Sequence, residues 1–499
     1  MPDIAEQQAH RLPTQSRHSV VSIMIDKTTE IVEYNRQKQE NLSIMIDKDA
    51  SIWYYFRGKV TDVNHEVLKQ VVLDQHEVIR NARIIPRNMY TFEPSADYIL
   101  TGLRRAGKST MLYHLIRQMT EANVLWEQII YINFEDERLV GFTTADFNDI
   151  VAIQSEMSNL PGHFFFDEIQ NIPGWEKFAR RMADFKEHVC ITGSNAKMLS
   201  REIETTLGGR YLTKQIRPYS FSEYLTARDI AHTEKDRTAT KSKAKIVSAL
   251  DVFLREGGLP ESLQYLNKRE YISSVFQKVL QGDIISRRGI RNEYAMKMLI
   301  KKIAETVKDE MSYSKLHGAL TGIGVKISKD SVIDYLQFAE EAYLLFPVRN
   351  WFSRFSDRES TPKYYLSDNG ILGLFLNNKE GILLENLTAV ELNREFGEDV
   401  YYLKSEKAGI DVDFYLPESG AAIQVCVDLN DQTAGREIGN LVRLAKNMRE
   451  VRRLIVVTRD PKQKVQTIDG RCIEIIPAEQ FYLSLHELQG TDRRQIITG

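Results

Sequence analysis

The sequence has few cysteines, no long hydrophobic run and almost no excess of charge of either sign. Its 499 residues include three cysteines, and the formal net charge at pH 7 is -3. Cys190, Cys426 and Cys472 lie far apart, without the C-x-x-C spacing of zinc or redox sites. An odd number of cysteines also cannot form a complete disulfide framework. We therefore expect buried free thiols and a reducing, cytoplasmic environment.

The chain also lacks the patterns of membrane and secreted proteins. No run approaches the roughly 18 apolar residues that a spanning helix needs, and the N-terminus has no basic head followed by an apolar core. We expect no membrane partner. Because the total charge is nearly balanced, a nucleic-acid contact would need a local basic face. Composition alone therefore leaves the partner open.

The best-defined motif lies at residues 98–118. It reads Tyr-Ile-Leu-Thr-Gly-Leu-Arg-Arg-Ala-Gly-Lys-Ser-Thr and continues as an amphipathic run. Gly102, Gly107, Lys108 and Ser109 match the phosphate-loop pattern G-x-x-x-x-G-K-[ST], with an apolar strand before it and a helical pattern after it. A glycine-rich turn without a ligand could also join a strand to a helix. The complete context favours a nucleotide site.

The chemistry of a phosphate loop explains these residue types. Glycine lets the backbone fold around a phosphate, so that amide N–H groups point inward beneath the positive end of the following helix. Lys108 is expected to reach the β and γ phosphates of ATP, and Ser109 to hold Mg²⁺. The predicted nucleotide-binding residues are Gly102, Leu103, Arg104, Arg105, Ala106, Gly107, Lys108, Ser109 and Thr110.

Two further apolar runs complete the expected nucleotide site. Residues 128–134 predict a strand, and residues 163–166 predict another that ends in Asp167 and Glu168. Adjacent acids at a strand end can present one carboxylate to Mg²⁺ and the next to a water molecule. Such pairs are usually solvated, but the position after four apolar residues favours catalysis. We assign Asp167 to the metal and Glu168 to the base that polarises the attacking water.

Two later features are further candidates for the same site. A strand at residues 188–192 is followed by Gly193, Ser194 and Asn195, and Ser194 or Asn195 could contact the γ-phosphate or the attacking water. The alternative is a simple polar turn. Arg210 lies on a short glycine-rich turn and could neutralise a phosphate in its own subunit or in a neighbour. The alternative is an ordinary surface arginine.

These motifs together resemble one family. The stretches Gly-Leu-Arg-Arg-Ala-Gly-Lys-Ser-Thr (102–110), Phe-Phe-Asp-Glu-Ile-Gln (165–170), Thr-Gly-Ser-Asn (192–195) and Arg-Pro-Tyr-Ser-Phe-Ser-Glu-Tyr (217–224) are similar to those of the predicted prokaryotic AAA+ superfamily ATPases. These proteins join an AAA-type module to a C-terminal domain of unknown function. The resemblance extends from about residue 90 to 480. It implies ATP binding and hydrolysis, and a helical lid after the core.

Residues 305–350 follow the order of a winged helix. A helix at 313–320, a turn, a second helix at 329–341 and an extended segment at 343–348 have this pattern, in which the second helix can enter a DNA groove. Several acids on that helix disfavour deep insertion, so a structural or protein-docking role stays open. The candidate phosphate contacts are Lys326, Lys329, Arg349, Arg354 and Arg358.

The last segment holds a second group of acids. A helical run with Glu385, a strand with Asp411 and Asp413, and a strand with Gln424 and Cys426 follow the order of the PD-(D/E)XK nuclease fold. In that fold a carboxylate and a lysine stand where this chain has the amide and the thiol, which cannot replace their charges. We expect a nuclease-like fold at 363–499 that lacks nuclease activity.

The predicted fold class is therefore α/β, with a parallel P-loop sheet of AAA+ type, a helical lid, a winged helix and a PD-(D/E)XK-like domain. The expected divisions are an irregular extension (1–60), the ATPase core (61–225), a lid region with an exposed loop at 226–245 (226–300), the winged helix (301–362) and the last domain (363–499). The predicted function is a Mg²⁺-dependent, oligomeric ATPase, possible as a ring, that acts on DNA. The alternatives are a regulatory switch that works through protein contacts and an ATP-gated nuclease.

Overall fold

The structure is a computed structural model that describes residues 64–489 except 88, 194–204, 377–378, 461 and 463, together with three short strands nearer the N-terminus. Those strands form an antiparallel sheet in the order β1-β3-β2. The sequence predicts an irregular extension at 1–60, and these three strands lie within that range. One β-branched residue followed by four aromatic residues, as in Ile52-Trp53-Tyr54-Tyr55-Phe56, favours a strand. The bounds are β1 Ser22–Ile23, β2 Leu42–Ile46 and β3 Ile52–Phe56.

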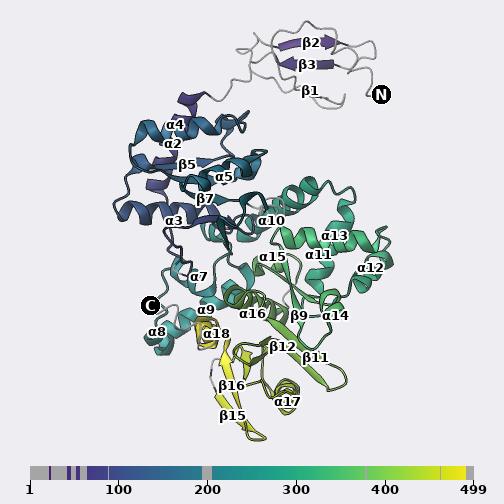
Figure 1. Ribbon diagram of the computed structural model, residues 1–499. Coiled ribbons are helices and arrows are strands. Elements are labelled where there is room, and N and C mark those ends of the chain that lie inside the picture. The colour runs from purple at the N-terminus through teal and green to yellow at the C-terminus, as the bar shows by residue number, and fades with distance from the viewer. Residues whose placement is uncertain are drawn as a thin grey trace.

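Five parallel strands form the sheet that carries the phosphate loop, in the order β5-β6-β7-β4-β8. Successive residues of a strand face opposite sides, so Phe164 and Phe166 pack in one core and Phe165 in the other. The parallel sheet is thereby covered on both faces (Figure 1). The strands are β4 Asp97–Thr101, β5 Ile129–Asn133, β6 His163–Asp167, β7 His188–Thr192 and β8 Tyr211–Gln215.

Helices of this first unit share their apolar residues between the two cores. Helices α2, α4 and α5 pack on the side of Phe164, and α3 packs on the side of Phe165. The sequence prediction of strands around the phosphate loop is thus confirmed. The helices are α2 His65–Asn81, α3 Lys108–Glu121, α4 Phe147–Met157 and α5 Trp175–Asp184, with short 3₁₀ turns η2 Trp126–Gln128, η3 Glu137–Leu139 and η4 Ile169–Asn171.

A helical segment follows the first sheet. The predicted loop at 226–245 is wrong in part, because α8 and the start of α9 lie within it. Thr233 and Asp236 form a capping box that supplies hydrogen bonds to the first turn of α8, although the helix itself buries no residue. The elements are α7 Phe221–Ala227, α8 Glu234–Thr238, α9 Thr240–Glu256, η6 Pro260–Gln264, α10 Lys268–Lys278, the π-helical η7 Val279–Ser286, α11 Glu293–Glu305, α12 Tyr313–Gly322 and α13 Lys329–Glu341.

The C-terminal part is built on an eight-stranded mixed sheet in the order β10-β9-β11-β12-β13-β14-β16-β15. Strands β9 and β10 are antiparallel, and β9 also pairs with β11. The predicted boundary at 362/363 therefore falls within a strand pair. The strands are β9 Leu345–Asn350, β10 Lys363–Leu366, β11 Tyr401–Ser405, β12 Ile410–Leu416, β13 Ala421–Cys426, β14 Arg453–Thr458, β15 Lys464–Ile468 and β16 Arg471–Pro477.

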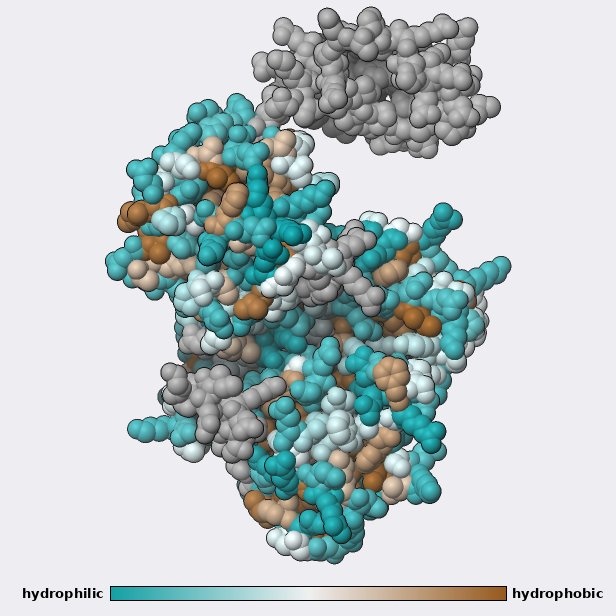
Figure 2. All heavy atoms as spheres, in the orientation of Figure 1, coloured by the Kyte–Doolittle hydropathy of each residue, from teal (hydrophilic) through white to brown (hydrophobic). Residues whose placement is uncertain are grey.

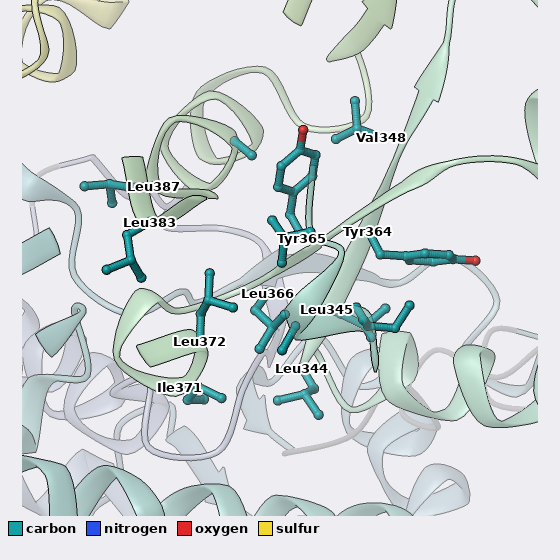
Figure 3. Packing of buried hydrophobic residues seen from close by; sticks show 14 of the residues in the cluster. Leu344, Leu345, Val348, Tyr364, Tyr365, Leu366, Ile371, Leu372, Leu383 and Leu387 are labelled. Carbon is teal, nitrogen blue, oxygen red and sulfur yellow. The ribbon is translucent and has the colours of Figure 1, made fainter. Parts of the chain in front are cut away.

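The largest core joins the helical segment to this second sheet. Figure 3 shows Leu366 of β10, Leu372 of α15, and Leu383 and Leu387 of α16 gathered in it. The same cluster includes Leu250, Leu299 and Leu336 of the helical segment, so this segment and the second sheet share one core. The remaining elements are α14 Phe355–Ser360, α15 Asn369–Gly373, α16 Glu380–Phe396, α17 Asp431–Asn447, α18 Ala478–Leu483 and η8 Leu485–Leu488.

The surface is mainly hydrophilic on the face in Figure 2, where hydrophobic residues occur in small separate groups. Of the helices that the structure describes, none combines the length and the apolar character needed to cross a bilayer.

Candidate functional site

The loop between β4 and α3 depends on glycine at two positions. Gly102 has φ +136°, and a Cβ atom there would lie 2.0 Å from the carbonyl oxygen of Ile216. Gly107 precedes α3 in the left-handed region, with φ +97°. Side chains rarely adopt such φ values, and the contact with Ile216 leaves no space for one. The loop can therefore take this shape only with glycine at both positions.

Lys108 lies within the concavity of this loop. It is buried, and its ammonium group donates to the carbonyl oxygens of Gly102 at 3.1 Å and Leu103 at 3.2 Å. Burial lowers the pKa of Lys108, while the Glu168 and Asp167 carboxylates act in the opposite direction. Both acids are therefore close enough to attract its charge. The lysine and the acid pair, which are about 60 residues apart in the sequence, form one site.

Asp167 and Glu168 have different surroundings although they are adjacent. Asp167 is buried at the end of β6, and its carboxylate accepts hydrogen bonds from the Tyr131 hydroxyl at 2.9 Å and from the Thr192 hydroxyl. Glu168 has φ +54°, and its backbone N–H donates to the Thr192 hydroxyl oxygen at 3.0 Å. The left-handed turn at Glu168 therefore separates the two side chains. This separation is needed if Asp167 binds a metal ion and Glu168 acts on water.

Tyr131 and Thr192, which were not among the predicted site residues, both contact Asp167. Each lies in a strand next to β6, and each hydroxyl orients Asp167. The only sequence feature that could have indicated them is a polar residue at the end of an apolar strand. The same feature led to the prediction of Ser194 and Asn195. Those two residues lie outside the described part of the chain.

The residues that follow Lys108 lie at the first turn of α3. Ser109 is half-buried and Thr110 is exposed. The loop therefore offers a buried cation, a half-buried hydroxyl and a neighbouring pair of carboxylates. This donor set fits a magnesium–triphosphate ligand, because the cation suits the phosphates and the oxygen groups suit Mg²⁺.

The side chains of Arg104 and Arg105 connect the loop to the helical segment. Arg104 donates to Asp283 of η7 at 3.0 Å and lies 3.8 Å from Glu135, which follows β5. Arg105 donates to both carboxylate oxygens of Glu261 at 2.9 Å. π-helical turns such as η7 occur frequently at functional sites. The sequence pattern assigned these arginines to the nucleotide loop but did not indicate their acidic partners.

Arg87 fixes the far side of the same loop. It is buried, donates to the Ala106 carbonyl oxygen at 3.1 Å, and pairs with both oxygens of Glu223 at 2.7 and 2.8 Å. Arg394 of α16 lies 3.7 Å from the same carboxylate. The loop, the segment before β4 and the C-terminal body thus meet in one buried ion network.

Replacing Arg87 by Met is expected to lower the free energy of unfolding by about 3–5 kcal/mol, because Glu223 would lose its bidentate partner while staying buried. Urea denaturation measures this difference. Arg83→Met is the matched control, since the Arg83–Asp229 pair is 3.9 Å long with side chains 79% and 89% exposed, and should cost less than about 1 kcal/mol. Equal losses in the two variants would contradict the assigned role of Arg87.

Arg210 is held by its own chain. Its Nε donates to Asp184 at 2.7 Å and its Nη1 donates to the Leu207 carbonyl oxygen at 3.1 Å. These contacts are with the end of α5 and the preceding turn, and none of the contacts described for Arg210 involves Lys108, Asp167 or Glu168. A role in a neighbouring subunit stays a prediction.

Glu385 of α16 and Asp413 of β12 lie beside Lys363, a lysine that was not among the predicted site residues. Lys363 of β10 is buried, and its ammonium lies 3.8 Å from Glu385 and 3.8 Å from Asp413. Burial raises the pKa of Asp413 far above its usual range, and Glu385 adds to this shift. Gln424 is also buried, with its side-chain oxygen unpaired among the described residues, whereas Asp411 is exposed.

The position of Lys363 indicates an ion triad in this cluster. Its cation lies between the carboxyl groups of Glu385 and Asp413. Within the described residues, no group of three or more His, Cys, Asp or Glu side chains is arranged to hold a metal. Glu385 and Asp413 both lie beside Lys363, and the nuclease-like assignment of these acids and of Gln424 stays a prediction.

Lys363→Met should reduce the free energy of unfolding by about 3–5 kcal/mol, because two buried acids would lose their shared cation. Lys446→Met is the control, as the Lys446–Asp469 pair has side chains 59% and 55% exposed. Chemical denaturation at several pH values is the measurement. The loss should shrink as the pH falls, because Asp413, whose pKa is raised by burial, then takes up a proton, and a loss that is independent of pH would contradict this role of Lys363.

The five candidate DNA contacts divide into two groups. Lys326, Lys329 and Arg354 are exposed. Arg349 instead pairs with Glu359 at 2.8 Å, and Arg358 donates to the Trp351 carbonyl oxygen at 2.9 Å. The structure therefore leaves three of these cations on the surface and engages two within the protein.

Comparisons with known proteins agree with the site. Residues 96–225 match the family model "AAA domain", and residues 248–381 match a domain of unknown function, DUF8612. The chain is 32% identical over 431 residues to the uncharacterized protein MJ1544 of Methanocaldococcus jannaschii, covering 84% of this chain and 95% of that protein. It is 28% identical over 363 residues to an uncharacterized protein of Haemophilus influenzae, covering 71% of this chain and 87% of that protein.

Solved structures give weaker likenesses. The Aeropyrum pernix ORC1 protein in complex with DNA shares 14% identity, with a TM-score of 0.24, and covers 66% of this chain and 93% of that one. Cdc6p from Pyrobaculum aerophilum shares 14% identity, with a TM-score of 0.21, and covers 67% and 96%. These scores are too low to support an argument about function.

Proposed function

Since the chain belongs to the family of the uncharacterized protein MJ1544 of Methanocaldococcus jannaschii and carries an AAA domain, we propose that it is a Mg²⁺-dependent ATPase that acts on DNA as an oligomer. The main support is the convergence of Lys108, Asp167 and Glu168 at one edge of a parallel sheet. Ligands of open α/β sheets bind at the carboxyl ends of the strands, where these residues lie.

Each residue has a distinct role in this proposal. The loop amides and Lys108 bind the phosphates, and Ser109 and Asp167 hold Mg²⁺, which neutralises charge on the transferring phosphoryl group. Tyr131 and Thr192 keep Asp167 in place through their hydroxyl groups. Glu168 accepts a proton from, or polarises, the attacking water. Buried Lys108 would exchange its two carbonyl contacts for phosphate oxygens.

The action on DNA rests on residues 293–366. Three helices, α11, α12 and α13, precede the antiparallel strands β9 and β10, which is the element order of a winged helix. Exposed Lys326, Lys329 and Arg354 would contact phosphates. Because Asp330 and Asp334 lie on α13, backbone contacts rather than deep reading of the groove suit this unit.

The test is the ATPase rate with and without single-stranded, duplex and branched DNA, alongside the mass in solution with a non-hydrolysed ATP analogue. DNA should raise the rate, and the stimulation should fall steeply with salt because phosphate contacts release counterions. A rate that no DNA changes, in a protein that still hydrolyses ATP, would reject the DNA role and leave the ATPase.

An arginine shared between subunits would explain why an oligomer is needed. We predict that Arg210→Ala and Lys108→Ala proteins, each inactive alone, recover part of the activity when mixed. In a mixed assembly an intact loop can meet an intact arginine. No recovery would mean that Arg210 acts within its own subunit or has no catalytic role, and an unmixed Arg210→Ala protein with wild-type activity would also exclude the shared site.

A regulatory switch is the second candidate, and the ion pairs of the loop favour it. Arg104–Asp283 and Arg105–Glu261 connect the nucleotide loop to the helical segment, so nucleotide binding could change the position of that segment. A switch would show slow hydrolysis, no DNA stimulation and a partner protein bound in only one nucleotide state. An ATP-gated nuclease is disfavoured by the cation of Lys363 between the two acids; plasmid cleavage that is lost in Asp413→Ala protein would restore it.

A further inference from the structure

A cavity separate from the acid pair lies where three parts of the chain meet. Its volume is about 510 Å³, within the range of roughly 300–1,000 Å³ for small-molecule sites. One wall is Leu103 of the phosphate loop with residues 215–218, the second comes from α13, β9 and α14, and the third from residues 390–401. Arg349 and Arg358 of this lining are also candidate DNA contacts, whereas Lys108, Asp167 and Glu168 do not line the cavity.

Arg217 supplies a positive charge without a carboxylate partner. Its guanidinium donates to the amide oxygens of Asn393 and of Gln215, the latter at 2.8 Å. Both partners are neutral, and among the described residues no carboxylate forms an ion pair with Arg217. Burial, followed by the nearby Arg394, lowers the pKa of Arg217 to about 10. A half-buried cation held only by dipoles is stabilised when an anion binds beside it.

Further hydrogen-bond donors line the same cavity. The Nε of Arg358 is buried and has no hydrogen-bond partner among the described residues. The hydroxyls of Tyr343 and Thr101 approach each other without a hydrogen bond of normal geometry. Tyr343 and Arg358 both line the cavity, and the Arg358 guanidinium can donate to a ligand.

The acids of the cavity do not cancel these donors. Glu359 already pairs with Arg349 at 2.8 Å, and Glu398 is exposed. Burial raises the pKa of Glu340 to about 7, so at neutral pH this group is only partly ionised. Arg217 and Arg358 therefore remain without a neutralising carboxylate.

Part of the wall is apolar. Leu345, Phe346, Val390 and Val400 line the cavity, together with Phe355, whose residue surface is 79% exposed. An inorganic ion would make no contact with these apolar side chains. A ligand with both a charged end and an apolar body matches the wall better.

We propose that this cavity binds a small organic anion, with its carboxylate or phosphate group on Arg217 and Arg358 and its apolar body against Phe346 and Val390. One wall belongs to the phosphate loop, and Ile216 contacts Gly102 so closely that a Cβ atom would not fit between them. The anion therefore changes the affinity for ATP, and ATP changes the affinity for the anion by the same factor.

The test uses phenyl phosphate, benzoate, inorganic phosphate and benzyl alcohol in isothermal titrations of the full chain. Phenyl phosphate and benzoate should bind, and the ion and the neutral alcohol should bind at least about tenfold more weakly, because each lacks one half of the recognised chemistry. Equal binding of inorganic phosphate would overturn the apolar part of the site. No binding of either organic anion at millimolar concentration would overturn the site itself.

Substitutions of the two arginines test whether phenyl phosphate binds in this cavity. Arg217→Gln and Arg358→Gln should each weaken phenyl phosphate about tenfold or more, whereas Arg449→Gln, an exposed arginine outside the cavity, should have no effect. Two arginine variants are used because one could disturb folding, which thermal melts would reveal. Unchanged affinity in both folded variants would reject the assignment.

The Lys108→Ala protein separates this proposal from the proposed ATPase function. Phenyl phosphate should still bind to it, since the cavity does not include Lys108, and loss of binding would place the probe in the phosphate loop and overturn the inference. A wild-type protein that binds phenyl phosphate but no ATP would reject the nucleotide function and leave the cavity intact. With both ligands present, equal shifts in the two affinities support coupling, and independent binding overturns it.

Discussion

Lys108→Ala protein is expected to lose ATP hydrolysis completely and most of its affinity for ATP. Lys108 is the cation within the loop, where its ammonium lies 3.1 and 3.2 Å from two loop carbonyl oxygens. A hydrogen bond to a charged group contributes roughly 1.5–3 kcal/mol, which corresponds to about 10- to 150-fold in affinity. The negative charge that develops on the phosphoryl oxygens makes the kinetic loss larger still.

The measurement is ATP binding by titration calorimetry, together with phosphate release. Lys177→Ala, which removes an exposed lysine from α5 on the same sheet, is the control for loss of charge alone. Circular dichroism should show the fold of both variants unchanged, because buried Lys108 carries a desolvation cost that the substitution removes. ATP affinity within a factor of two of the wild type in the Lys108→Ala protein would reject the nucleotide site at this loop.

Glu168→Gln protein should bind ATP normally but hydrolyse it about 10²- to 10⁴-fold more slowly, the usual contribution of a positioned general base. The amide cannot take up a proton, yet it preserves the size of the side chain. Glutamine can also occupy the left-handed backbone conformation at this position as readily as glutamate does, so the turn with φ +54° should persist. Asp167 keeps its two hydroxyl donors in this variant, and Mg²⁺ binding should therefore persist.

Single-turnover hydrolysis, with bound nucleotide identified after separation, distinguishes the chemical step from binding. Glu121→Gln, an exposed acid at the end of α3, is the matched control. A wild-type hydrolysis rate in the Glu168→Gln protein would mean that another group orients the water. Loss of ATP binding would instead show that Glu168 supports the loop, where its carboxylate acts on the charge of Lys108.

The lid region and the segment after it show which local structures could be predicted from the sequence. The polar run at 226–245 was predicted to be a loop, because composition indicates exposure but does not exclude an exposed helix. In the structure α8 buries no residue, yet its capping box satisfies the backbone donors of its first turn. The extended run at 343–348 was predicted more accurately and forms most of β9. The sequence did not show that β10 pairs with β9, because the pairing of two strands depends on residues that are distant in the sequence.

The sequence by itself determined the phosphate loop, the parallel strands around it and the acid pair at a strand end. Each of these depends on contiguous residues: glycines for a backbone turn, apolar runs for buried strands, and a fixed position of the acids after such a run. Asp167 and Glu168 could therefore be assigned before any contact was known.

Only the tertiary structure decided which distant side chains meet these elements. Arg104 and Asp283 are 179 positions apart, and Arg87 and Glu223 are 136 apart. Lys363 reaches Glu385 and Asp413 from another strand of the sheet, and Arg217 lines a cavity with residues from all three walls. Charged residues look alike in the sequence whether they are solvated or buried. Their roles follow from the partners that chain folding brings within a few ångströms, and no local periodicity encodes those partners.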